Sequence, residues 1–182
     1  MLPPEDFSNT HIFYKSGSSG INIDATPGSM FLFNIFRRRD INLELAISSE
    51  NNKILDFFMF ESSAINTFDK DLFLDRVKHN TFKQSIKLKT YKLSDILNKY
   101  AFNREIDLLS IDTEGHDFDV LQSNDWIKYR PMYVLIEEIS TDYHNLSKLP
   151  SVEYLKSKGY KIIAFTDLNI LFTRCKNERR ND

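Results

Sequence analysis

The spacing of hydrophobic positions changes along the chain from strict alternation to about one residue in every three or four. Alternation over residues 41–47, I-N-L-E-L-A-I, predicts a strand, and residues 53–60 predict a second strand that would form a hairpin with it. The continuous apolar run at residues 132–136 is typical of a strand buried on both faces. Together these patterns predict strands at residues 21–24, 41–47, 53–60, 85–90, 106–111, 132–136, 160–165 and 169–174.

Helical spacing separates most of these strands. A proline near the first turn favours a helix ending at about residue 36, and Gly159 is placed to end a helix over residues 152–158. The predicted helices cover residues 11–15, 27–36, 70–77, 93–100, 116–122 and 152–158. Because strands and helices alternate, the sequence predicts an α/β fold with a mostly parallel sheet and a C-terminal antiparallel hairpin over residues 160–174.

Composition narrows the class of protein. The chain has 182 residues, 41% of them hydrophobic, which predicts one domain over residues 1–182 with its core at about residues 8–174. A net charge of −2 gives no general attraction to nucleic acid or anionic membranes. No apolar run approaches the roughly 18 residues of a membrane helix. The single cysteine suits a reducing compartment and the N-terminus has no secretory pattern, so we expect a cytoplasmic location.

The candidate chemistry is concentrated in residues 106–119, I-D-L-L-S-I-D-T-E-G-H-D-F-D. An apolar strand ends here at Asp112, and Glu114, His116, Asp117 and Asp119 follow within eight positions. Ligands in open α/β sheets bind beyond the carboxyl ends of the strands, so this is a plausible edge of an active site. The alternative is an acidic first turn of a helix, which the helix dipole favours without any function.

Three stretches resemble the FkbM-type methyltransferases. They are G-I-N-I-D-A-T-P-G-S at residues 20–29 with R-D-I-N-L-E-L-A-I-S at 39–48, then D-T-E-G at 112–115 with its preceding strand, and R-P-M-Y-V-L-I-E at 130–137. The resemblance runs from about Ser8 to Arg174. It implies a Rossmann-like fold and S-adenosylmethionine-dependent O-methylation of a sugar or natural-product hydroxyl.

The resemblance also implies roles for individual residues. Asp24 would accept hydrogen bonds from the cofactor ribose, and Ile47 and Ser48 would contact its adenine. Asp112 would bind the methionine end of the cofactor or the acceptor hydroxyl. The candidate catalytic residues are therefore Asp112, Glu114 and His116, with His116 as a general base because its ordinary pKa lies near neutrality. Residues expected to contact the substrate are Glu137, Glu138 and Asn66.

The sequence departs from the family pattern at its start. A complete member has a first strand and a glycine-bearing turn before the first helix, which lets the backbone approach the cofactor. Gly17 and Gly20 precede the strand that ends at Asp24, so neither is that turn. We therefore expect a sheet without its first strand and glycine turn, and weak or absent cofactor binding. This leaves a non-catalytic Rossmann-like module as the alternative function.

A metal-dependent hydrolase is a third interpretation, since hard cations bind clustered carboxylates. Its ligands would be Asp112, Glu114, His116 and Asp117, which all come from one six-residue loop. Most metal sites draw their ligands from several elements, so the sequence does not favour a metal.

Overall fold

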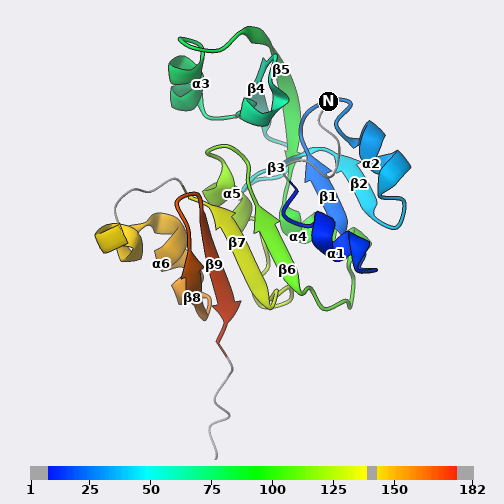
Figure 1. The fold of residues 1–182 in the computed structure, drawn as a ribbon, viewed down its shortest axis with the longest axis vertical. Helices are drawn as coiled ribbons and strands as arrows, with labels where there is room; N and C mark the ends of the chain where they lie inside the picture. Colours follow the sequence, from blue (N-terminus) through cyan, green and yellow to red (C-terminus); the bar gives the residue numbers. More distant parts are fainter. Residues whose placement is uncertain (1–7, 139–142, 176–182) are drawn as a thin grey trace, which may run out of the picture. The chain divides into compact units, whose positions relative to one another are not determined.

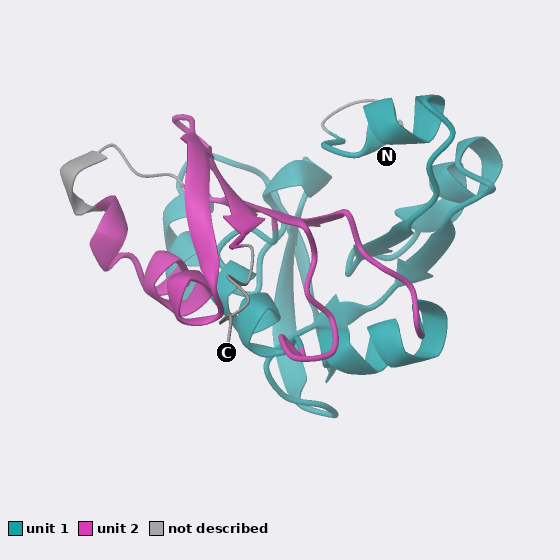
Figure 2. Ribbon diagram, turned by 90° about the horizontal axis from the view of Figure 1, so that it is seen from below, with its two compact units in different colours: residues 1–102, 113–124 teal, residues 103–112, 125–182 magenta. Residues whose placement is uncertain are grey.

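The computed structural model describes residues 8–138 and 143–175. The chain divides into two compact units (Figure 2). Unit 1 comprises Met1–Phe102 and Thr113–Asn124, and unit 2 comprises Asn103–Asp112 and Asp125–Asp182. The two units are therefore interleaved along the sequence, and each is described separately.

Unit 1 begins with a small parallel sheet of two strands and two short helices (Figure 1). Ile21 pairs with Ile41 and Asp24 pairs with Glu44, so both strands end in a carboxylate at the same edge. The crossover helix α2 lies between the strands in sequence and packs against β2. The elements are α1 (His11–Lys15), β1 (Ile21–Asp24), α2 (Met30–Phe36) and β2 (Ile41–Glu44).

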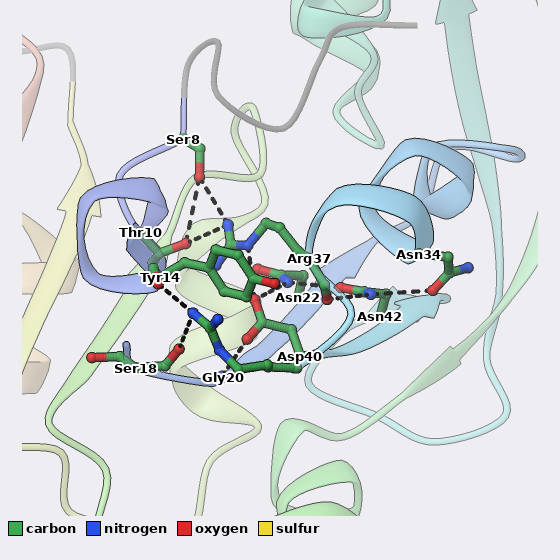
Figure 3. Close-up of polar contacts among 11 residues, drawn as sticks. Ser8, Thr10, Tyr14, Ser18, Gly20, Asn22, Asn34, Arg37, Asp40 and Asn42 are labelled. Carbon is green, nitrogen blue, oxygen red and sulfur yellow. Dashed lines mark hydrogen bonds and ion pairs between the residues drawn. The ribbon is translucent and has the colours of Figure 1, made fainter. Parts of the chain in front are cut away.

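A buried ion pair holds these elements together (Figure 3). The Arg37 and Asp40 side chains are 3% and 0% exposed, and Arg37 Nε donates to Asp40 Oδ2 at 2.8 Å. Buried charges are costly unless their remaining hydrogen-bonding positions are filled. Here they are filled by Ser8 Oγ and Thr10 Oγ1, which accept from Arg37, and by Gly20 N and Asn22 Nδ2, which donate to Asp40.

The second sheet of unit 1 has the order β3-β5-β4 and corrects the predicted hairpin. Residues 41–47 do not form one strand: they divide at Leu45 into β2 and β3 (Ala46–Ile47). Strand β3 pairs in parallel with β5 (Phe82–Tyr91), and β4 (Ile54–Phe60) pairs antiparallel with β5. The predicted pairing of 41–47 with 53–60 is wrong because β2 has β1 as its partner, which ends at Asp24.

Short helices complete unit 1. After β4 come η1 (Ser63–Ile65) and α3 (Lys70–Arg76), and Phe73 of α3 stacks on Phe58 with ring centroids 4.2 Å apart. Helices α4 (Leu93–Tyr100) and α5 (Asp117–Gln122) are joined where Ser123 Oγ accepts from Leu93 N at 3.0 Å. The buried apolar side chains here include Phe57, Met59, Phe60, Leu93, Ile96, Leu97, Val120 and Leu121.

Unit 2 contains a four-stranded sheet with the order β6-β7-β9-β8. Strands β6 and β7 are parallel, and the C-terminal strands form the predicted antiparallel hairpin. Val134, Ile136, Ile170 and Phe172 are fully buried, in agreement with the apolar run predicted as a strand. The elements are β6 (Leu108–Ile111), β7 (Tyr133–Glu137), η2 (Tyr143–Lys148), α6 (Pro150–Ser157), β8 (Tyr160–Phe165) and β9 (Asn169–Arg174).

The prediction of an α/β protein is thus confirmed, but as several sheets with both parallel and antiparallel pairs. The expectation about a first strand falls on residues 1–7, which lie outside the described residues. Among the helices that the structure describes, none has the length and apolar character needed to cross a membrane.

Candidate functional site

Two carboxylates lie side by side at the carboxyl ends of β1 and β2 in unit 1. Asp24 and Glu44 are paired in the parallel register. Each carboxylate is held by one backbone amide: Thr26 N donates to Asp24 Oδ1 at 2.7 Å, and Met30 N donates to Glu44 Oε1 at 3.1 Å. The second oxygen of each side chain has no hydrogen bond to the described residues. Both side chains are therefore oriented and still able to accept from a ligand.

A partly open hollow of 340 Å³ adjoins these strand ends. Its walls are mainly apolar, and Glu44, Lys89 and Tyr91 are the polar residues among those that line it. Concave sites with apolar walls and a few polar groups are typical of small-molecule binding. The residues that line it are Ala25, Pro27, Glu44, Leu45, Ala46, Leu88, Lys89 and Tyr91.

The end of β3 brings Ser48 to His116. Ile47 and Ser48 are buried, and Ser48 is only 1% exposed. The Ser48 Oγ lies 3.1 Å from His116 Nε2. On the other side of the imidazole, Nδ1 lies 3.7 Å from Asp119 Oδ2, and Asp119 Oδ1 accepts from Ser49 Oγ at 2.7 Å. We call these four residues, Ser48, Ser49, His116 and Asp119, the serine–histidine cluster.

Burial lowers the pKa of His116 from its ordinary value of 6.5. Asp119 and Asp69 oppose this change because their negative charges raise the pKa, whereas Lys53 lowers it further. The Phe68 ring, 5.3 Å from the imidazole centroid to centroid, contributes to the apolar surroundings. The imidazole is therefore neutral near pH 7.

The D-T-E-G loop turns sharply and is fastened to α3. Glu114 and Gly115 both have positive φ angles, of 53° and 92°. The Glu114 carboxylate forms an ion pair with Arg76, and its carbonyl oxygen accepts from Thr67 Oγ1 at 2.7 Å. A Cβ added to Gly115 would lie 2.5 Å from Leu72 Cδ1. Glycine at this position therefore allows both the turn and the close contact with α3.

Asn66 is a buried connector between segments of unit 1. Its Oδ1 accepts from Phe60 N at 2.9 Å, and its Nδ2 donates to Thr26 Oγ1 at 3.1 Å. Both ends of the amide are thus used within the protein. The prediction that Asn66 contacts the substrate stays a prediction, and the observed bonds give the side chain a structural role.

The remaining predicted residues lie in unit 2, where β6 and β7 end side by side. Ile111 pairs with Ile136, which places Asp112 and Glu137 at the same edge of the sheet. Asp112 is exposed, and its carboxylate has no hydrogen-bonding partner within residues 8–138 and 143–175. Glu138 is attached to α6, because its Oε2 accepts from Ser151 Oγ at 3.1 Å.

The predicted site residues therefore fall into groups. Unit 1 brings His116 to Ser48 and pairs Asp24 with Glu44, which lines the hollow, whereas Asp112, Glu137 and Glu138 belong to unit 2. Sequence reasoning missed Glu44, Arg76 and Thr67 as parts of the site, and it gave Asp119 of the acidic stretch no individual role. Asp119 carried a signal, because it lies three residues after His116 on a predicted helix. Arg76 carried no such signal, because its partner, Glu114, is distant in the sequence.

The comparisons with known proteins give one match. The family model for the methyltransferase FkbM domain matches residues 3–162 of the 182-residue chain. No curated protein and no solved structure matches the chain significantly. The matched region contains Asp24, the D-T-E-G loop, and strands β6 and β7, after which Asp112 and Glu138 follow. The chain therefore belongs to the FkbM methyltransferase family, whose chemistry is methyl transfer.

Proposed function

We propose that this protein methylates a hydroxyl oxygen of a sugar or natural product, with S-adenosylmethionine as the methyl donor on a Rossmann-like arrangement of strands. The observation that carries the proposal is the Asp24–Glu44 pair at the ends of two parallel strands, beside an apolar-walled hollow, in a chain of this family.

The residues of unit 1 fit the nucleoside part of this cofactor. Two ribose hydroxyls are donors, and the free oxygens of Asp24 and Glu44 are acceptors already oriented by backbone amides. The apolar walls at Leu45 and Ala46 suit a flat base. Ile47 and Ser48 follow Ala46 directly in the chain, where the family resemblance places the adenine, although both side chains are buried.

When bound, S-adenosylmethionine supplies an electrophilic methyl group on a sulfonium. The protein then has to orient the acceptor hydroxyl and receive its proton. Of the three candidate catalytic residues, Glu114 is paired with Arg76 and His116 is bonded within the serine–histidine cluster. Asp112 is exposed and has no hydrogen-bonding partner among the described residues, so of the three it is the candidate that remains for the proton-accepting role. Such a base contributes a factor of roughly 10² to 10⁴.

Binding of S-adenosylmethionine to the full chain, measured by calorimetry, tests the proposal. We expect binding that is weak but saturable, and that Asp24→Asn weakens further by about tenfold or more, because hydrogen bonds to a charged acceptor contribute roughly 1.5–3 kcal/mol. Asp56→Asn is the matched control: Asp56 is an exposed strand aspartate that pairs with Lys87. We expect it to bind like the parent protein.

Two results would contradict the proposal. The absence of saturable binding up to millimolar concentration would favour the non-catalytic module, as would equal affinity of Asp24→Asn and the parent. If binding is found, transfer of a labelled methyl group to a panel of sugars and hydroxylated natural products identifies the acceptor. Asp112→Asn should then slow turnover by about 100-fold or more while cofactor affinity stays within about threefold.

A further inference from the structure

The serine–histidine cluster joins two segments that are distant in the sequence. Ser48 and Ser49 follow β3, whereas His116 is the N-cap of α5 and Asp119 lies in its first turn. Its contacts are the Ser48 Oγ to His116 Nε2 distance of 3.1 Å and the Ser49 Oγ to Asp119 Oδ1 hydrogen bond of 2.7 Å. All of these residues belong to unit 1.

The protonation of the imidazole follows from its neighbours. A neutral imidazole carries its proton on one ring nitrogen and a lone pair on the other. The groups that face the two nitrogens decide which of them is protonated. The Asp119 carboxylate faces Nδ1 and only accepts, so the proton is favoured at Nδ1. In that tautomer Nε2 carries the lone pair, and the Ser48 hydroxyl, 3.1 Å away, is placed to donate to it. Both ring nitrogens are thus directed at protein groups.

We propose that His116 is a positioning residue that fastens the Ser48–Ser49 loop to α5, and that it does not accept the proton of the methyl acceptor. The inference rests on the proposed function, in which the loop after β3 contacts the cofactor. By holding this loop in place, His116 controls cofactor affinity, whereas the proton-accepting step belongs to another group.

The spatial arrangement of Ser48, His116 and Asp119 also resembles a catalytic triad, in which a histidine base oriented by an aspartate activates a nucleophilic serine. One observation disfavours that activity: Ser48 is 1% exposed, so a carbonyl substrate has no access to its Oγ. Labelling of Ser48 by a fluorophosphonate probe would overturn the positioning role.

Two substitutions separate positioning from base catalysis. The side-chain amide of His116→Gln extends to the place of Nε2, where its oxygen can accept from Ser48. The amide of His116→Asn reaches only the place of Nδ1. Neither amide can take a proton near neutral pH, so a general base would be lost equally in both variants.

Steady-state kinetics of the full chain give the first readout. We expect His116→Asn to raise the KM for S-adenosylmethionine about tenfold, while its kcat stays within about threefold of the parent value. His116→Gln should restore most of the lost affinity. If turnover instead slows by about 100-fold or more in both variants while KM is unchanged, the proposal is overturned and His116 is the base.

Nitrogen-15 NMR of the imidazole gives a readout that needs no cofactor. We expect a neutral ring with its proton on Nδ1 in the parent protein at pH 7. A proton on Nε2 would overturn the proposal, because Ser48 could not then donate to that nitrogen. If the parent binds no S-adenosylmethionine but shows the Nδ1–H form, the proposed function fails while the bonding of the cluster is confirmed.

Discussion

At the scale of single residues, the carboxylates of this protein differ mainly in what already binds them. Glu114 is neutralised by Arg76, and Asp40 is enclosed with Arg37. Asp24 is held through one oxygen only, and Asp112 has no hydrogen-bonding partner in the described part of the chain. Among these carboxylates, Asp24 and Asp112 therefore keep oxygens that can still accept a hydrogen bond from a ligand.

His116 should make stability depend on pH. Its pKa in the folded protein is lowered below the ordinary 6.5, so the unfolded chain binds more protons as the pH falls through that range. The free energy of unfolding therefore decreases on going from about pH 7.5 downward through 6.5 to the folded-state pKa. Urea unfolding of the parent and His116→Gln at a series of pH values measures this. We expect a smaller decrease for the variant.

The quantity to compare is the slope of the free energy of unfolding against pH. The absolute free energies differ in any case, because the substitution itself changes packing. Parallel curves for the two proteins between about pH 7.5 and 5 would show that His116 has no lowered pKa.

The positions of the candidate residues at strand ends could be predicted from the sequence better than the contacts that decide their roles. Asp24, Asp112 and Glu137 were expected at strand ends, and they end β1, follow β6 and end β7. The ion pair of Glu114 with Arg76 and the two bonds of Asn66 were not predictable. These contacts join segments that are distant in the sequence, and local periodicity carries no information about such pairs.

At the scale of elements, the D-T-E-G loop combines a turn with close packing. Gly115 has φ 92° and lies against α3, where an added Cβ would meet Leu72 Cδ1 at 2.5 Å. Gly17 has a similar φ of 99°, but nothing lies within 4 Å of its ideal Cβ. The two glycines therefore separate the cost of the backbone conformation from the cost of the contact.

Gly115→Ala and Gly17→Ala form a matched pair of variants. Both should be destabilised by the positive φ, which costs about 1–3 kcal/mol for a residue with a side chain. Gly115→Ala should lose a further ~1–3 kcal/mol, because Leu72 or the loop must move. Urea unfolding measures both values. Equal losses would show that the contact with Leu72 is relaxed in solution.

Strand positions were predictable, but their partners were not. Alternation over residues 41–47 correctly indicated extended backbone, yet the segment divides at Leu45 between two sheets. Alternation reports which side chains face the same way, and it does not report which strand lies alongside. The C-terminal hairpin was predictable because its strands are joined by a tight link, which leaves few alternatives.

At the scale of the whole molecule, the two compact units are interleaved. The chain leaves unit 1 after Phe102 and returns to it at Thr113–Asn124. The returning segment supplies buried Val120 and Leu121, and Ser123 accepts from the first amides of α4. Unit 1 therefore depends on residues that lie beyond the first 102 in sequence. A single domain over residues 1–182 remains the prediction for the whole chain.

Fragments of the chain test this dependence. We expect residues 1–124 to unfold cooperatively in urea, and residues 1–102 to lack a cooperative transition and dispersed amide NMR signals. The shorter fragment loses the core side chains of α5, the Ser123 acceptors of Leu93 and Ser94, and the His116 partner of Ser48. Residues 1–112 are the length control, because they extend the shorter fragment without adding the returning segment, and should behave like 1–102. Equal urea midpoints for all three fragments would show that unit 1 folds without Thr113–Asn124.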